Sequence, residues 1–236
     1  MTSVNFHIIT LFPEAIRPYL EASIIGRAVR NKIITVSLYQ LRDFIKQRGQ
    51  AQTSRGLTQT KDYLRADDRP YGGGPGMVLQ AKPILDAVEK IQKKISKKSR
   101  VKKIKVILFG ASGKQFTNSY AINISKRYTD IILIAGRYEG VDARVKKILR
   151  AEEISIGPYI LTGGELPAAV AIDAVTRHIP GVLGKDKSVE ERRIASPEVY
   201  TRPEVLRYKG RNYIVPKVLL SGNHQKIEEW KKKKRG

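Results

Sequence analysis

The sequence predicts an α/β fold with one large domain and a small C-terminal appendage. Apolar runs of strand length occupy residues 4–9, 33–39 and 104–109, and stretches with helical spacing separate them. A further run, at residues 130–135, is almost wholly apolar, which is typical of a central strand covered on both faces. Strands that alternate with helices favour a parallel sheet. The length of 236 residues and the 41% hydrophobic content suffice for such a core.

The first connection is expected to be one helix from Pro13 to about residue 31. Apolar residues recur there at every fourth position from Ile16 to Ala28. No helical or strand period is sustained between residues 43 and 79. An irregular stretch of that length inside a compact domain is usually functional or disordered.

Residues 67–77, DDRPYGGGPGM, end this irregular stretch with four glycines and two prolines. Such a composition predicts a turn-rich unit. Asp68, Arg69 and Tyr71 are acidic, basic and aromatic side chains that suit contact with an RNA base or phosphate. A merely flexible surface loop is the alternative interpretation of the same composition.

The chain is strongly basic. Its 45 Lys and Arg residues against 22 Asp and Glu residues give a formal charge of +23, which attracts polyanions such as nucleic acid. Residues 90–105 hold nine basic side chains and no acid. We expect this run to attract phosphates without sequence specificity, although a solvated helix face would have the same composition.

Other classes of protein are disfavoured. The absence of cysteine excludes disulfides, zinc–thiolate sites and thiol catalysis, and it fits a reducing compartment. The N-terminal apolar run lacks a basic start and is interrupted by Pro13 and Glu14, so neither a signal peptide nor a membrane span is expected. The sequence therefore predicts a soluble cytoplasmic protein, and we see no metal site in it.

Two glycine turns follow the later strands. Residues 110–114, GASGK, resemble a phosphate loop but lack its full spacing, so a nucleotide-hydrolase interpretation is weak. Residues 136–142, GRYEGVD, lie between the 130–135 strand and a helix, where open α/β sheets bind ligands. The alternative is structural, because Glu139 and Asp142 would also favour a helix N-terminus.

The chain is organised around residues 153–184, EISIGPYILTGGELPAAVAIDAVTRHIPGVLG. A short strand at 154–156 leads into a glycine-rich loop whose backbone can approach a ligand closely. A helix is expected from Glu165 to Arg177, and Leu166, Val170 and Ala174 share one of its sides. On spacing alone, the ordinary role of Arg177 is an ion pair with Asp173.

Several of these segments together resemble the bacterial tRNA (guanine-N1)-methyltransferases of the SPOUT superfamily. The matching runs are FPE at 12–14, GRA at 26–28, RDF at 42–44, DDRPYGGGPGM, GRYEG, the 155–184 stretch, YTRPE at 200–204 and VPKVLLSGNH at 215–224. The resemblance covers nearly the whole chain. It implies a SPOUT-type parallel sheet with a deep trefoil knot, S-adenosylmethionine as the methyl donor, and the guanine just 3′ of the tRNA anticodon as the target.

The resemblance also implies particular site residues. Those expected at the cofactor are Leu108, Phe109, Gly110, Gly136, Ile156, Gly157, Pro158, Tyr159, Ile160, Leu161, Gly163 and Gly164. Those expected at the RNA are Asp68, Arg69, Tyr71, Arg202 and His224. Arg177 and Glu139 are expected in catalysis, with Arg177 as the cation beside guanine O6. Residues 108–114 depart from the family pattern LSPQGR by lacking the proline and replacing its arginine with Lys114.

The general base is where this chain departs most from the family, which generally uses an aspartate after GVLG. Ungapped alignment puts Arg192 there, and arginine cannot act as a base at neutral pH. We expect Glu191 to be the base, with Glu190 as the next candidate and Asp186 as a more distant one.

The resemblance implies further organisation. Residues 1–184 form the methyltransferase domain, 185–200 a linker, and 201–236 a shortened RNA-binding domain for the anticodon arm. The family is an obligate homodimer whose active site uses both chains, and Mg²⁺ is associated with its activity. A ribose 2′-O-methyltransferase of the same superfamily and an RNA-binding homologue without catalysis remain alternatives.

Overall fold

The computed structural model describes residues 4–45, 65–98, 103–183 and 198–235. The chain divides into two compact units, Met1–Val182 and Leu183–Gly236. The first unit contains the parallel sheet and the second contains a hairpin and two helices. None of the described helices is both long and apolar enough to cross a membrane.

The first unit is built on a five-stranded parallel sheet in the order β2-β1-β6-β5-β7. The predicted parallel α/β fold is therefore confirmed. The strands are β1 (Val4–Thr10), β2 (Ile34–Gln40), β5 (Ile104–Gln115), β6 (Asp130–Ile134) and β7 (Glu152–Ser155). A separate two-stranded sheet pairs β3 (Asp67–Asp68) with β4 (Val78–Leu79).

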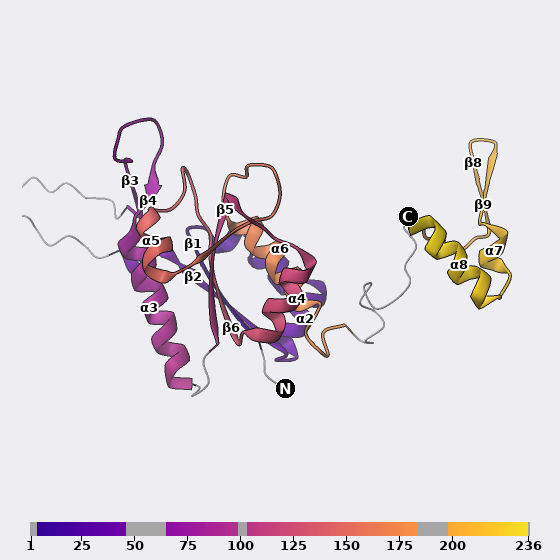
Figure 1. Ribbon diagram of the computed structural model, residues 1–236, viewed down its shortest axis with the longest axis horizontal. Coiled ribbons are helices and arrows are strands. Elements are labelled where there is room, and N and C mark those ends of the chain that lie inside the picture. The colour runs from indigo at the N-terminus through magenta and orange to yellow at the C-terminus, as the bar shows by residue number, and fades with distance from the viewer. Residues whose placement is uncertain (1–3, 46–64, 99–102, 184–197, 236) are drawn as a thin grey trace, which may run out of the picture. The chain divides into compact units, whose positions relative to one another are not determined.

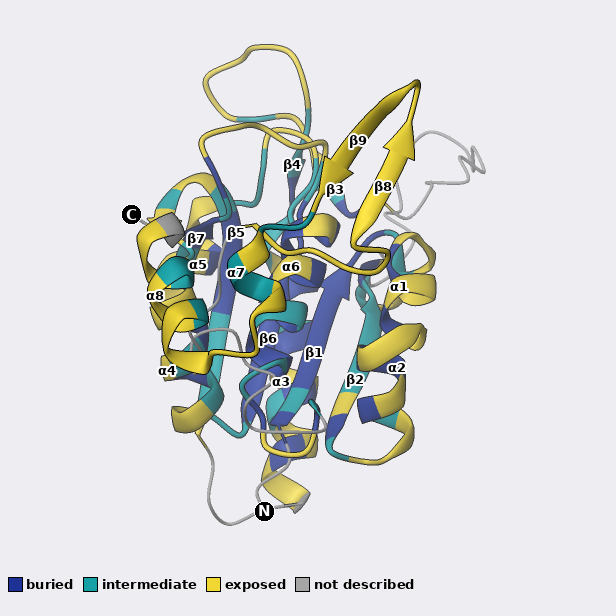
Figure 2. Cartoon of the chain, turned by 90° about the vertical axis from the view of Figure 1, so that its right-hand side faces the viewer, coloured by how far each residue is buried: buried dark blue, intermediate teal, exposed yellow. Residues whose placement is uncertain are grey.

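Helices cover both faces of the sheet (Figure 1). On one face lie α1 (Arg17–Glu21), α2 (Ser23–Arg30), α4 (Asn118–Arg127) and α6 (Glu165–Thr176). On the other face lie α3 (Ala81–Lys98) and α5 (Ala143–Leu149). Side chains of β6 alternate between the two cores, so that Ile131 and Ile132 contact opposite layers. Figure 2 shows β1 and β6 buried, as the apolar run at 130–135 predicts.

The single helix expected from Pro13 to residue 31 is wrong in detail. A 3₁₀ turn, η1 (Pro13–Ala15), comes first, and α1 and α2 are then separated at Ala22, whose backbone is extended. Gly26 packs so tightly on the Glu21 carbonyl that a side chain would clash there. The break therefore lets α2 turn closely over the end of α1, which a continuous helix would prevent.

The strand expected at 104–109 is longer than predicted. Both Phe109 and Lys114 pair with Ile154, and residues 110–113 bulge out between them. The GASGK turn is therefore an irregularity inside β5, and α4 starts only at Asn118, after its cap Thr117. This explains why no phosphate-loop geometry forms there.

The second unit is small and mostly exposed. A hairpin of β8 (Val205–Tyr208) and β9 (Arg211–Ile214) precedes α7 (Lys217–Leu220) and α8 (His224–Arg235). The Asn223 side chain accepts a hydrogen bond from the Lys226 amide, so Asn223 is the N-cap of α8. Tyr200 and Trp230 rings lie 6.4 Å apart and join the start of this unit to its last helix.

Candidate functional site

Loops at the carboxyl ends of neighbouring strands gather most of the predicted site. Residues 135–142 follow β6, residues 156–164 follow β7, and residues 110–113 bulge from β5 between them. The carboxyl ends of parallel strands are where open α/β sheets bind ligands. The fold therefore brings the predicted cofactor residues to one edge of the sheet.

The GRYEG loop is fastened to the DDRPYGGGPGM segment. The Glu139 amide donates to the Met77 carbonyl at 3.0 Å, and the Leu79 amide donates to the Gly140 carbonyl at 3.0 Å. Gly76 has a φ of +91°, which favours glycine, and a Cβ there would lie only 2.5 Å from Glu139 Cγ, so the two segments cross closely. Two motifs far apart in sequence thus form one wall of the site.

The GRYEG loop is also joined to the loop after β7. The Gly164 amide donates to the Gly136 carbonyl at 2.8 Å, and Arg137 forms an antiparallel bridge with Gly163. A Cβ at Gly164 would lie 2.6 Å from Ala135 Cα, which leaves no space for a larger residue. Protein atoms therefore fill the space that the two glycines at 163 and 164 leave.

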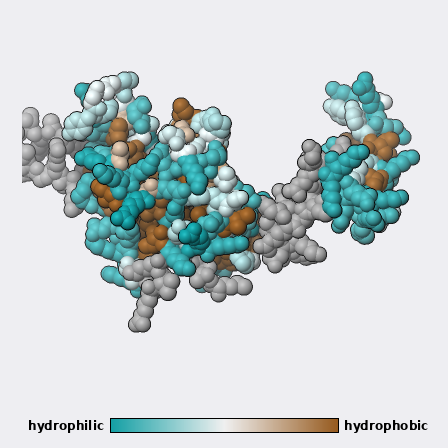
Figure 3. Space-filling model, viewed as in Figure 1, coloured by the Kyte–Doolittle hydropathy of each residue, from teal (hydrophilic) through white to brown (hydrophobic). Residues whose placement is uncertain are grey.

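The outer part of the loop after β7 presents apolar side chains and backbone amides that make no hydrogen bond. Tyr159, Ile160 and Leu161 are exposed, Ile160 by 87%. Their backbone amides donate to no hydrogen bond within the part of the chain that the structure describes. Hydrophobic residues also reach the surface of the first unit in Figure 3. Unused amides beside exposed apolar side chains can offer a ligand both hydrogen bonds and apolar contact.

Other predicted cofactor residues are buried or packed on protein. The side chains of Leu108 and Phe109 belong to the two hydrophobic cores, so only their backbone is available to a ligand. Gly110 packs against the Glu153 carboxylate, and the Tyr159 ring covers Gly157. Ile156 is half-buried against the core, and Pro158 is exposed.

The acids of the site have separate roles. The Asp142 carboxylate caps α5 by accepting from the Arg144 amide at 2.9 Å, which confirms the structural interpretation of Asp142. Its hydrogen bonds from the Arg144 guanidinium hold the pKa of Asp142 below its usual value. The hydrogen bond from Lys146, at 2.7 Å, likewise lowers the pKa of Glu153. Glu139 forms no ion pair within the described residues, which leaves its carboxylate available to a ligand.

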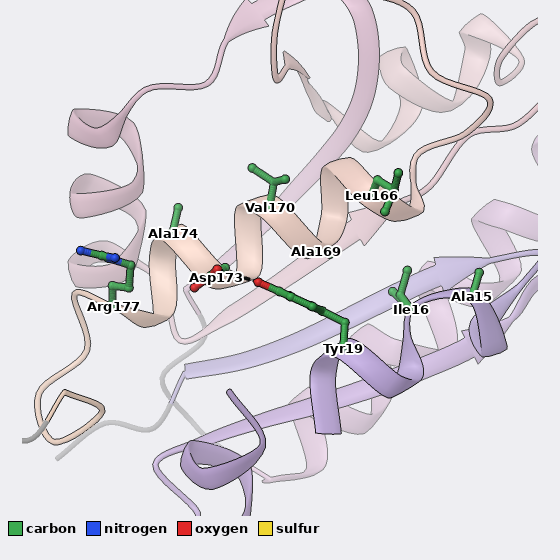
Figure 4. A pocket seen from close by; sticks show the side chains of 9 residues that line it. All are labelled: Ala15, Ile16, Tyr19, Leu166, Ala169, Val170, Asp173, Ala174 and Arg177. Atoms are coloured by element: carbon green, nitrogen blue, oxygen red, sulfur yellow. Dashed lines mark hydrogen bonds between the residues drawn. The ribbon is translucent and has the colours of Figure 1, made fainter. Parts of the chain in front are cut away.

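Arg177 lies at the far end of α6 from these loops. The 12 residues of α6 extend about 18 Å at 1.5 Å per residue, and Figure 4 places Leu166 and Arg177 at its opposite ends. The fold of one chain therefore does not bring Arg177 to the loops after β6 and β7.

The expected ion pair between Arg177 and Asp173 is absent among the described residues. Asp173 instead accepts a hydrogen bond from the Tyr19 hydroxyl at 2.6 Å (Figure 4). This hydrogen bond raises the pKa of Tyr19 to about 12. Tyr19 and Arg177 line a surface cavity of about 450 Å³ together with Ala15, Ile16, Leu166, Ala169, Val170, Asp173 and Ala174.

The predicted RNA-binding residues are exposed. Asp68, Arg69 and Tyr71 stand at or beyond the end of β3, and the Asp68 carboxylate accepts from the Arg69 amide at 2.8 Å. Arg202 and His224 belong to the second unit and are exposed there. The candidate bases Asp186, Glu190 and Glu191 lie outside the described residues.

Sequence reasoning missed two buried polar residues beneath the loops. Thr10 is the last residue of β1 and Glu165 the first of α6, and their side chains form a hydrogen bond of 2.6 Å. The sequence signal that could have identified Glu165 is its place at the start of a largely apolar helix, because such a helix is mostly buried and a buried carboxylate is unusual. No group of three or more metal-ligating side chains occurs among the residues that the structure describes.

Comparison with known proteins gives one consistent result. A model of the family described as "tRNA (Guanine-1)-methyltransferase TrmD" matches residues 4–236. A protein of Alkaliphilus oremlandii named tRNA (guanine-N(1)-)-methyltransferase is 43% identical over 230 residues, which cover 95% of this chain and 84% of the relative. A protein of Clostridioides difficile with the same name is 41% identical over 233 residues, 97% of this chain and 91% of the relative. A third, from Buchnera aphidicola, is 39% identical over 236 residues, 98% of this chain and 90% of the relative.

Proposed function

Because the chain belongs to the tRNA (guanine-1)-methyltransferase family, we propose that it methylates N1 of the guanine 3′-adjacent to the anticodon (position 37) in tRNA. The observation that carries the proposal is the convergence of the loops after β6 and β7 with the 69–77 segment. The shared name of the relatives favours base methylation over ribose 2′-O-methylation and over an RNA-binding protein without catalysis.

The loops at residues 135–142 and 156–164 together form what we call the cradle. Its residues fit S-adenosylmethionine as the methyl donor. The amides of Tyr159, Ile160 and Leu161 offer hydrogen bonds to the adenine edge, and their side chains offer apolar contact. Gly136 is half-buried, and a Cβ there would be in ordinary contact with the Val141 side chain at 3.4 Å, so the glycine leaves this side of the cradle less crowded than a larger residue would. When bound, S-adenosylmethionine supplies the methyl group as an electrophile on its sulfonium.

The chain must also provide an acceptor site. Methylation at guanine N1 requires removal of the N1 proton and a cation near O6, where negative charge develops. Arg177 supplies the permanent positive charge. Glu191, or Glu190 next to it, supplies the carboxylate base, and Glu139 holds the guanine and donor in line from the wall beside Gly76.

A homodimer explains how Arg177 reaches the site. Leu166, Val170, Ala174 and Arg177 form one stripe along α6, and Leu166 is 61% exposed and Val170 45% exposed. In a two-fold dimer with antiparallel α6 helices, this stripe contacts its own copy. Arg177 of one protomer then lies beside the start of α6 in its partner, where the 156–164 loop ends.

Substitution of Val170 by aspartate is expected to convert the dimer to monomers. The carboxylate would be buried and unpaired at the self-contacting stripe, whereas it would be solvated in a monomer. Sedimentation velocity of the full chain measures the change. Ile148→Asp is the matched control, because Ile148 is 60% exposed on α5 and outside the stripe. A Val170→Asp protein that sediments as the wild type does would contradict the antiparallel arrangement.

Other features of the proposal follow from the family. The 1–184 domain contains the trefoil knot of the SPOUT fold. Residues 185–200 link this domain to the 201–236 unit, which holds the anticodon stem-loop with Arg202 and His224. The exposed lysines of α3 attract its phosphates. A tRNA substrate places the enzyme in the cytoplasm.

Mass spectrometry of tRNA transcripts tests the function. Incubation with S-adenosylmethionine should add one methyl group at N1 of the guanine after the anticodon. A transcript with adenine at that position should gain none. Methylation of a ribose hydroxyl would support the alternative enzyme, and RNA binding without methylation would support the non-catalytic homologue.

A further inference from the structure

We infer that Thr10, Glu165 and Arg137 form a buried positioning network that holds together the two donor loops, residues 135–142 and 156–164, an inference that rests on the proposed function. Thr10 Oγ1 donates to Glu165 Oε1 at 2.6 Å, and Arg137 Nε lies 2.9 Å from Glu165 Oε2. The three residues come from the end of β1, the loop after β6 and the start of α6. One carboxylate therefore links three strand or helix ends.

The network is buried. Glu165 is 3% exposed, Thr10 is fully buried, and the Arg137 side chain is 21% exposed. Arg137 Nε and Glu165 Oε2 face each other without the alignment of a hydrogen bond. A buried ion pair contributes little net stability because the desolvation of both charges opposes their attraction. A contribution to the stability of the fold therefore does not by itself explain why this ion pair is buried here.

Arg137 connects the network to both loops. Its guanidinium donates to the Thr162 carbonyl at 3.3 Å and lies 4.7 Å from the centre of the Phe12 ring. The Phe12 amide in turn donates to Thr10 Oγ1 at 2.9 Å. Glu165 carries its negative charge in the first turn of α6, where the helix dipole favours it. The spacing between the GRYEG loop and the 156–164 loop thus depends on this charge as well as on the backbone contacts that join the two loops.

This dependence predicts a selective defect in donor binding. In Glu165→Gln the amide still accepts from Thr10, but the attraction to Arg137 is lost and the amide nitrogen faces a guanidinium. The two loops should then separate by a fraction of an ångström. Since misplacement of this size weakens contacts across a site strongly, the Kd for S-adenosylmethionine and for S-adenosylhomocysteine should rise at least about tenfold.

Calorimetric titration of full-length variants with S-adenosylhomocysteine measures this effect without turnover. Glu165→Gln and Arg137→Lys should both bind about tenfold more weakly or worse, with tRNA affinity unchanged in filter binding. Thr10→Ser keeps the hydroxyl and should bind as the wild type does, whereas Thr10→Val should weaken binding. If Glu165→Gln does not fold, the comparison of Thr10→Ser with Thr10→Val still tests whether the network supports donor binding.

The matched control is Glu152→Gln. Glu152 accepts from Tyr120 and pairs with Lys105 in the same unit, but on β7 away from the two loops. Loss of the Glu152 charge should lower the melting temperature of the protein without changing its affinity for the donor. Equal weakening in Glu152→Gln and Glu165→Gln would overturn the inference, as would wild-type affinity in Glu165→Gln. A wild-type protein that binds no donor would instead refute the proposed function.

Discussion

Replacement of Arg177 by alanine is expected to lower kcat by about 10²- to 10³-fold while the affinity for S-adenosylmethionine stays unchanged. The effect is large because a preorganised cation stabilises charge that develops on guanine O6 only in the transition state. Donor affinity should be kept because the proposed contact of Arg177 is with guanine O6, whereas the backbone amides of residues 159–161 contact the donor. Single-turnover kinetics and calorimetry separate the two quantities.

Mixing subunits tests whether Arg177 acts across the dimer. Arg177→Ala protomers can be combined with protomers that carry Gly136→Val, a change that adds a branched side chain beside Val141 in the cradle. If the site is shared, each mixed dimer contains one site with an intact cradle and an intact arginine. Activity should then return to about a quarter of the wild-type value after random exchange. Failure to regain activity would place Arg177 and the cradle in the same protomer's site.

Substitution of Glu191 by glutamine is expected to lower kcat by about 10²- to 10⁴-fold, the range for loss of a general base. The amide cannot accept the N1 proton, although it keeps the size and hydrogen bonding of the carboxylate. The rise of kcat with pH on the acidic side should disappear in the variant. Pre-steady-state rates over a pH series measure both effects.

Two further variants sharpen this test. Glu190→Gln is the matched control and should retain nearly full activity. Arg192→Asp places an aspartate where ungapped alignment puts the family's base. It should therefore recover activity in the Glu191→Gln background. Unchanged methylation by Glu191→Gln would dismiss Glu191, and loss in Glu190→Gln alone would move the base by one residue.

The helix and strand positions followed closely from local patterns, with instructive exceptions. The apolar run at 130–135 corresponds to β6, and the 165–177 spacing corresponds to α6. The single helix from Pro13 failed because Gly26 allows α2 to pack on Glu21. The bulge at 110–113 was missed because it exists only in the pairing of β5 with β7.

The candidate site was predictable as a set of motifs and not as a geometry. The glycine turns and GRYEG identify loops after strands, but nothing local indicates that Glu139 crosses Gly76 or that Asp173 binds Tyr19 in place of Arg177. Thr10 and Glu165 are 155 positions apart, so their hydrogen bond has no local signature.

The order of strands and helices, the burial of β6 on both faces and the basic charge are properties of local composition and period, and the amino-acid chain alone determines them. Strand order in the sheet, the contact between the two donor loops and the distance from Arg177 to those loops depend on packing between distant segments. Such contacts join residues that share no sequence pattern, which is why only the folded structure decides them.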